Sequence, residues 1–294
     1  MNKTILLFTL LLSYNNAKSQ DYSNYYEQCN TADSLAYVGL HNQALDTLKL
    51  TFQSVDYIHS LNIRVAYLLA IKLEKFEDAF DYGKKLLINS GEKGYINTKS
   101  VEFKQSIYYN QLTDSADFYL KKFNNRVNQD YINLIDSLYY IDQRIIRKNR
   151  SVRGKFDIIK KSLPKNRFEL DSSNWLVLSK LIDSLGFPSE QNVGKNAYGK
   201  VCIIIHHNLR LKENEDYDPK IFEFIRIGDY LPQSLSFWYE QYQMQVKGRT
   251  FFTTWDEDIS KINLSRIDIN RRTFFLKGIN SFDIQNNGRK MNSK

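Results

Sequence analysis

A short pattern recurs three times in the first half of the chain, at a spacing of about three dozen residues. Its copies centre on Ala44, Ala79 and Ala116, which are 35 and 37 residues apart, and each opens an amphipathic stretch that carries lysines. A small side chain repeated at this position lets one helix approach its neighbours closely. A repeat of this length predicts stacked helical pairs, and three pairs are the minimum that buries a continuous core.

This pattern resembles the tetratricopeptide repeat, a helix–turn–helix unit. The best copy is Ala66–Leu87, and Gly39 falls where the first copy turns between its helices. The Trp and Pro that are usual in that family are absent from these copies. The resemblance implies a helical solenoid over residues 20–127, with a concave face that binds a peptide or protein. The alternative is a plain helical bundle whose alanines coincide.

The N-terminus has the pattern of a signal peptide. Lys3 precedes the apolar run Ile5–Leu12, and Ala17-Lys18-Ser19 supplies small residues for cleavage,. The run is too short to span a bilayer, and the alternative is a buried N-terminal helix. We therefore expect residues 1–19 to be removed near Ser19/Gln20 and the mature chain to be exported, to the periplasm or beyond, without a transmembrane span.

Composition favours helices and does not demand a disulfide. Only 4 prolines and 12 glycines occur in 294 residues, which favours long helices over a many-stranded sandwich. The two cysteines, Cys29 and Cys202, could pair in an oxidising compartment. We favour two buried thiols that pack as small apolar groups, because a chain of this length needs no bridge to fold.

The positive charge is concentrated in one segment. Arg144–Arg167 holds ten Lys or Arg against the single acid Asp157, which makes it +9, whereas the whole chain is +8. Such a segment could meet an anionic surface. Nucleic acid is not an expected partner of an exported protein. The alternative is a solvated connection between two domains.

The second half, residues 128–285, is predicted to be a helical domain with a small β element. Asp171 to Asn174 offer N-caps for one helix, and Gly186-Phe187-Pro188 ends it. Residues 286–294 are expected to form a disordered tail. The expected helices are Asp130–Lys148, Trp175–Leu185, Lys195–Leu211, Pro219–Ile227 and Pro232–Val246, and the expected extended segments are Arg249–Trp255 and Arg271–Leu276.

Two adjacent histidines, His206 and His207, follow the apolar run Val201–Ile205. The run fits a strand or a helix, and its flanks favour a helix. No HExxH and no paired CxxC supplies further ligands, so no metal site and no cofactor are expected. A histidine base would need an orienting carboxylate. Packed histidines with hydrogen-bonded partners are the alternative, and the carboxylates on offer are Asp142, Asp171, Asp256 and Asp268.

The second half also resembles a bacterial family known only as a domain of unknown function. The resemblance covers about Asp136 to Phe282 and implies His207 as the position of interest, but it implies no reaction. Glu240-Gln241 and Phe252-Thr253-Thr254 depart from the family pattern. The residues that carry the resemblance are Asp142-Gln143-Arg144, Asp171, Asn174, Gly186-Phe187-Pro188, Val193-Gly194, Ile204-Ile205-His206-His207 and Asp268-Ile269-Asn270-Arg271-Arg272.

These patterns favour an exported protein- or peptide-binding or scaffold module of a bacterial cell envelope, with His206, Arg271 and Arg272 as candidate binding residues. The alternative is a hydrolase-like enzyme. Its candidate catalytic residues are His207, Asp142 and Gln143, with Arg272 nearby. No GxSxG motif and no phosphate-binding glycine loop occurs in the sequence,. An enzyme requires His207 in a concave pocket with a carboxylate or Arg within hydrogen-bond reach. The binding module instead predicts a buried, hydrogen-bonded His207 and a groove of exposed Tyr and Phe.

Overall fold

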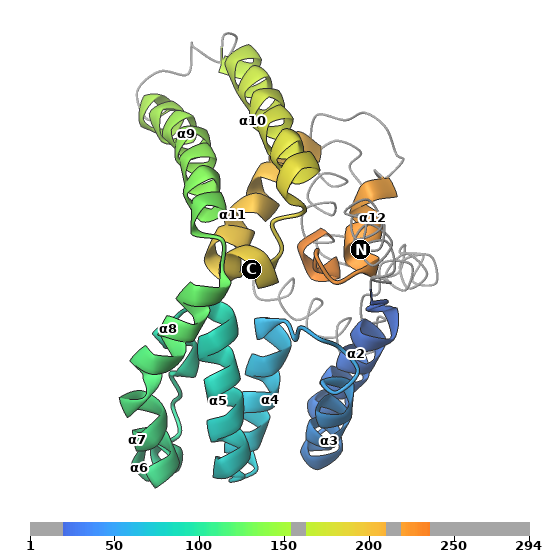
Figure 1. The fold of residues 1–294 in the computed structure, drawn as a ribbon, viewed down its shortest axis with the longest axis vertical. Helices are drawn as coiled ribbons and strands as arrows, with labels where there is room; N and C mark the ends of the chain where they lie inside the picture. The colour runs from blue at the N-terminus through green and yellow to red at the C-terminus, as the bar shows by residue number, and fades with distance from the viewer. Residues whose placement is uncertain (1–19, 154–162, 210–218, 236–294) are drawn as a thin grey trace, which may run out of the picture.

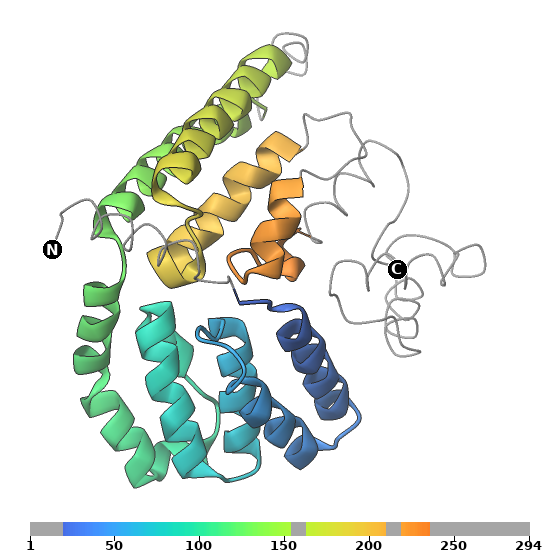
Figure 2. The ribbon, with the colours of Figure 1, turned by 45° about the vertical axis from the view of Figure 1, so that its right-hand side comes forward.

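The computed structural model describes residues 20–153, 163–209 and 219–235, and every regular element in that part of the chain is a helix (Figures 1 and 2). The mainly α class is therefore confirmed. The predicted β element, the signal segment and the C-terminal tail all lie outside the described residues. None of the described helices combines the length and the apolar character that a bilayer crossing requires.

The first half begins with two helical hairpins. Within each hairpin the helices pack closely, and α4 also packs on α3. The helices are α2 (Ser23–Tyr37), α3 (His41–Thr51), α4 (Ser60–Lys72) and α5 (Phe76–Ser90).

The turns of these hairpins repeat the same backbone geometry. Gly39 and Glu74, which lie 35 positions apart, both have left-handed φ, at 87° and 57°. The residue that follows each turn donates its N–H to a carbonyl five residues back, from Leu40 to Leu35 and from Lys75 to Ala70, at 2.9 Å in both. The turn predicted at Gly39 is confirmed. The repeat is therefore visible in the backbone as well as in the alanines.

The third unit is less regular. It comprises the short 3₁₀ helix η1 (Lys93–Ile96) and the helices α6 (Val101–Gln105), α7 (Ile107–Asp114) and α8 (Ala116–Arg126). Only Ser115 separates α7 from α8, and its φ of −89° lacks the left-handed turn.

All three repeated alanines are buried, with exposed fractions of 0% for Ala44 and Ala79 and 2% for Ala116. A Cβ placed on Gly83 of α5 would collide with Leu112 of α7. The close helix approach that small residues predict is therefore present. The tetratricopeptide-like character of the stack stays a prediction.

The second half contains α9 (Gln129–Arg153), α10 (Leu163–Leu185), α11 (Glu190–Leu209) and α12 (Pro219–Arg226). Helices α9 and α10 lie side by side (Figures 1 and 2), and the basic segment joins them. Helix α10 begins eight residues before Asp171, so the predicted N-cap is wrong. It ends as expected, because Gly186 takes a left-handed φ of 81° and its N–H donates to Ile182.

The run that ends in two histidines is part of helix α11, which confirms the helical interpretation. The helix is kinked at Gly194, whose φ of 75° and ψ of 164° are not helical. A Cβ at this position would collide with the ring of Phe123 on α8. Glycine is required here both for its backbone freedom and for close packing on the first half.

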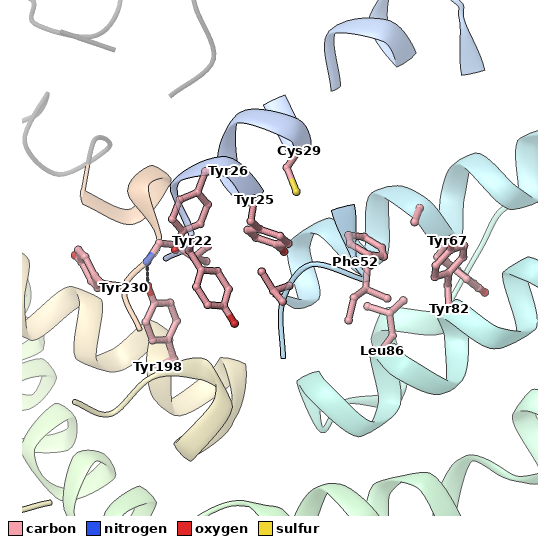
Figure 3. Close-up of a cluster of buried hydrophobic side chains, with 14 of the residues drawn as sticks. Tyr22, Tyr25, Tyr26, Cys29, Phe52, Tyr67, Tyr82, Leu86, Tyr198 and Tyr230 are labelled. Carbon is pink, nitrogen blue, oxygen red and sulfur yellow. Dashed lines mark hydrogen bonds between the residues drawn. The ribbon is translucent and has the colours of Figure 1, made fainter. Parts of the chain in front are cut away.

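The two halves share one interior. A single cluster of buried apolar side chains runs from Tyr22 near the start of α2 to Leu235. In Figure 3, Tyr22, just before α2, is drawn beside Tyr198 of α11. The Tyr198 hydroxyl accepts a hydrogen bond of 2.8 Å from the N–H of Leu231. The N–H of Tyr22 also donates to the carbonyl of Arg226 at 2.7 Å. The domain boundary expected at residue 127 stays a prediction, but this shared core argues against two halves that fold separately.

Candidate functional site

Three helices of the second half bring two carboxylates and an imidazole together. Asp142 comes from α9, Asp171 from α10 and His207 from α11. The Nδ1 atom of His207 lies 2.9 Å from Oδ1 of Asp142 and 3.9 Å from Oδ1 of Asp171. All three are buried, with exposed fractions of 1%, 5% and 8% for Asp142, Asp171 and His207. We call these three residues the Asp–Asp–His cluster.

A neighbouring amide fixes the orientation of the first carboxylate. Gln143 Nε2 donates a hydrogen bond of 2.9 Å to Oδ2 of Asp142. The two oxygens of Asp142 therefore have separate partners, Gln143 on one side and His207 on the other. A carboxylate held at both oxygens cannot rotate freely, so it presents Oδ1 to the imidazole in one defined geometry.

The side-chain amide of Asn174 is buried one helical turn after Asp171 on α10. Asn174 follows Asp171 by one helical turn, so both side chains leave the same face of α10,. Asn174 is buried, and its Nδ2 has no hydrogen-bond partner among the described residues. A buried amide without a partner costs about 1–3 kcal/mol. The Nδ2 group of Asn174 can therefore donate a hydrogen bond to a further group.

Two contacts between α9 and α11 show how these helices align at the cluster. Lys200 Nζ on α11 lies 2.7 Å from Oδ1 of Asp136 on α9. The Asp142–His207 contact follows six residues later on α9 and seven later on α11. At about 1.5 Å per residue these steps are nearly equal, so the two helices run parallel here. Buried apolar residues fill the layer between the two contacts, among them Val201 and Ile204.

Of the three candidate binding residues, only His206 lies in the described part of the chain. His206 is buried, and its ring centroid lies 5.5 Å from that of His207. Successive helical residues point about 100° apart, and the described contacts to Asp142 and Asp171 come from His207. Arg271 and Arg272 lie outside the described residues.

From the sequence, Asp171 is a candidate helix cap and also a candidate carboxylate partner of a histidine, whereas Asn174 is a candidate cap alone. Of the positions in the quoted motifs, Asp142, Asp171 and His207 come together here from three helices. No local spacing within the sequence connects them.

A second buried polar group lies between the two halves, and the sequence analysis did not detect it. Glu190, at the start of α11, is 1% exposed. Its Oε1 accepts hydrogen bonds from the N–H of Ser60, at 2.8 Å, from the Ser60 hydroxyl, and from the Tyr57 hydroxyl at 3.3 Å. Nδ1 of His59 lies 3.9 Å from Oε2. Glu190 lies 130 or more positions from Ser60 and Tyr57 in the sequence, so no local motif predicts these contacts.

The electrostatics of Glu190 identify it as a structural carboxylate. Burial by itself raises its pKa, but the neighbouring His59 and the hydrogen bonds from Ser60 outweigh burial, and the pKa lies below its usual value,. The carboxylate is therefore charged at neutral pH and joins the loop before α4 to the start of α11.

Both cysteines are free and buried. Burial raises the pKa of the Cys29 thiol and of the Cys202 thiol to about 12,. At neutral pH neither offers the thiolate that a nucleophile or a metal ligand requires. The favoured interpretation of two packed thiols is therefore confirmed.

No family model, curated protein or solved structure matches this chain.

Proposed function

We propose that this protein is a hydrolase-like enzyme and that the Asp–Asp–His cluster is its reaction centre. The supporting observation is the 2.9 Å contact between His207 Nδ1 and Asp142 Oδ1, with Asp171 at 3.9 Å. A histidine that acts as a base requires a carboxylate that orients the imidazole, and Asp142 is within hydrogen-bond reach to do so,. One acceptor satisfies the hydrogen bond of a buried imidazole nitrogen, whereas two carboxylates lie near Nδ1 of His207.

The cluster can activate water in either of two ways. Asp142 can accept a hydrogen bond from Nδ1–H of His207, which leaves Nε2 free to take a proton from water,. Alternatively, the three residues can hold a cation whose bound water ionises. Both routes use the same side chains, and in both Gln143 holds Asp142 in place. His207 is the most exposed member of the cluster, with an exposed fraction of 8%.

A panel of chromogenic esters, phosphoesters, glycosides and peptides tests this function with the full mature chain. We expect turnover of at least one class, and a loss of about a hundredfold or more in His207→Gln and Asp142→Asn, because each removes a member of the reacting group. Asp130→Asn is the matched control, since Asp130 is an exposed carboxylate at the start of the same helix. Turnover that persists unchanged in both cluster variants would contradict the proposal.

A binding or scaffold role in the cell envelope is the second candidate. The turn between α2 and α3 exposes three large apolar side chains within four residues, Tyr37, Val38 and Leu40, and such a group suits a protein or peptide partner. However, most aromatic side chains of the first half are buried or half-buried, so the described residues do not display the expected aromatic groove. Capture of an envelope protein by the full chain, lost in Val38→Ser, would favour this role.

Export and the anionic surface belong to the same proposal. The signal-peptide pattern of residues 1–19 supports release into the periplasm or the medium, and cleavage near Ser19/Gln20 would appear in the N-terminal sequence of the mature protein. The charge of Arg144–Arg167 supports contact with anionic headgroups or cell-wall phosphates,. Retention on anionic vesicles that weakens with added salt tests that contact.

A further inference from the structure

The donor set of the Asp–Asp–His cluster has the composition of a metal site. Two carboxylate oxygens and one imidazole nitrogen lie within 4.8 Å of one another. These ligand types together suit zinc, manganese or iron, whereas calcium and magnesium prefer oxygen alone. Three protein ligands also leave coordination positions open, as in catalytic sites.

The orientation of the imidazole supports the same conclusion. The nitrogen that faces Asp142 also faces Asp171, because Nδ1 lies at 2.9 Å from one carboxylate and 3.9 Å from the other. A single hydrogen bond needs one acceptor. Two carboxylates that converge on one ring nitrogen enclose a position that all three atoms can share.

One observation in the surroundings points to a ligand, and a second is compatible with it. Asn174 is buried on the same helix face as Asp171, and its amide Nδ2 has no hydrogen-bond partner among the described residues. Gln143 donates to the far oxygen of Asp142, and metal-binding carboxylates are held in this way by neighbouring groups.

We propose that Asp142, Asp171 and His207 bind one divalent transition-metal cation. The cation takes the place of the proton on His207 Nδ1, and that nitrogen becomes a ligand. Asn174 Nδ2 donates a hydrogen bond to a water in the remaining coordination sphere. These are the residues of the proposed hydrolase, and a bound cation would select the second of its two ways of activating water. Metal binding itself does not depend on the proposed function; only the role of the cation in turnover rests on it.

The test measures metal binding directly, in the full mature chain with its purification tag removed. After chelation and dialysis, Zn²⁺ and Mn²⁺ are titrated calorimetrically, with Mg²⁺ and Ca²⁺ for comparison. We expect one equivalent of Zn²⁺, tighter binding of Zn²⁺ than of Mn²⁺, and a rise in melting temperature on binding. Wild-type protein that binds no equivalent of either transition metal overturns the proposal.

Variants locate the cation. Asp171→Asn and His207→Gln each remove a ligand and should weaken binding by about a hundredfold or more. Gln143→Ala removes only the support of a ligand and should weaken it by roughly 10–100-fold. Asp130→Asn, at an exposed carboxylate of the same helix, should bind within twofold of wild type. Equal affinity in wild type, Asp171→Asn and His207→Gln would place the metal elsewhere and refute the site.

A spectroscopic measurement covers the case in which a cluster variant fails to fold. Co²⁺ bound to the wild-type chain should give a visible spectrum of nitrogen and oxygen ligands without thiolate charge transfer, since no cysteine belongs to the cluster. A thiolate band would contradict the ligand set. Hydrolysis that continues after chelation would support the enzyme proposal and refute a role for the cation in turnover. Metal binding without any turnover would support the metal site and refute the enzyme proposal.

Discussion

Asp229 lies after α12, close to the seam between the two halves, and it offers a quantitative test of the shared interior. Burial raises the pKa of its carboxyl from 3.8 to about 6, and the neighbouring Ser189 and His59 offset burial only in part. A carboxyl whose pKa is higher in the folded state is protonated more readily there than in the unfolded chain. Ionisation of Asp229 therefore destabilises the fold.

The shift sets the size of this effect. Each pKa unit corresponds to about 1.4 kcal/mol, so a shift of about 2 units costs up to about 3 kcal/mol above pH 6. The cost is absent below pH 3.8, where both states are protonated, and it grows as the pH rises to 6. The substitution Asp229→Asn keeps the shape and removes the charge. It should therefore stabilise the protein at pH 7.5 by about 2–3 kcal/mol.

Urea unfolding at pH 7.5, 5.0 and 3.5 measures the difference between the variant and wild type. The gain should shrink at pH 5.0 and vanish near pH 3.5. Asp46→Asn, which changes an exposed carboxylate on α3, serves as the control and should stay within about 0.5 kcal/mol at every pH. A variant that is less stable at pH 7.5, or a gain that does not depend on pH, would show that Asp229 is not held in a desolvated seam.

Three further predictions concern the first half and its junction with the second. Glu74→Gly should stabilise the protein by about 0.5–1 kcal/mol in urea unfolding, because its left-handed φ strains a residue with a Cβ,; a loss of stability would contradict the repeated turn. Ala79→Leu should destabilise it by about 1–3 kcal/mol or more through overpacking,, and an unchanged midpoint would mean that α5 does not pack tightly there. Glu190→Gln should cost about 1–3 kcal/mol at pH 7. Because the pKa of Glu190 is lowered in the folded state, this cost should shrink as acid protonates it, and a cost that grows in acid would exclude the ion-paired carboxylate,.

The sequence predicted the helices better than their limits. Periodicity located α9, α11 and α12, and Gly186 correctly marked the end of α10. The start of α10 was misplaced because Asp171 and Asn174 belong to residue types that favour caps. In the structure both face inward, where a tertiary role outweighs their local preference. Composition cannot distinguish a capping aspartate from a buried one.

The site was predictable only in part. The sequence singled out His207 together with Asp142 and Gln143, and the structure joins these three by hydrogen bonds. The contribution of Asp171 depends on how α10 packs beside α9 and α11, which no spacing within the chain encodes. The prediction of no metal site came from local motifs alone, and such motifs cannot detect ligands that come from three separate helices.

The most direct test of the central claim is a crystal structure of the mature chain soaked with Zn²⁺, with an anomalous difference map collected at the zinc edge. The account predicts a single strong peak at about 2.0–2.2 Å from Nδ1 of His207 and from a carboxylate oxygen of both Asp142 and Asp171. A map without a peak at this position, or with peaks only on surface residues, would contradict it.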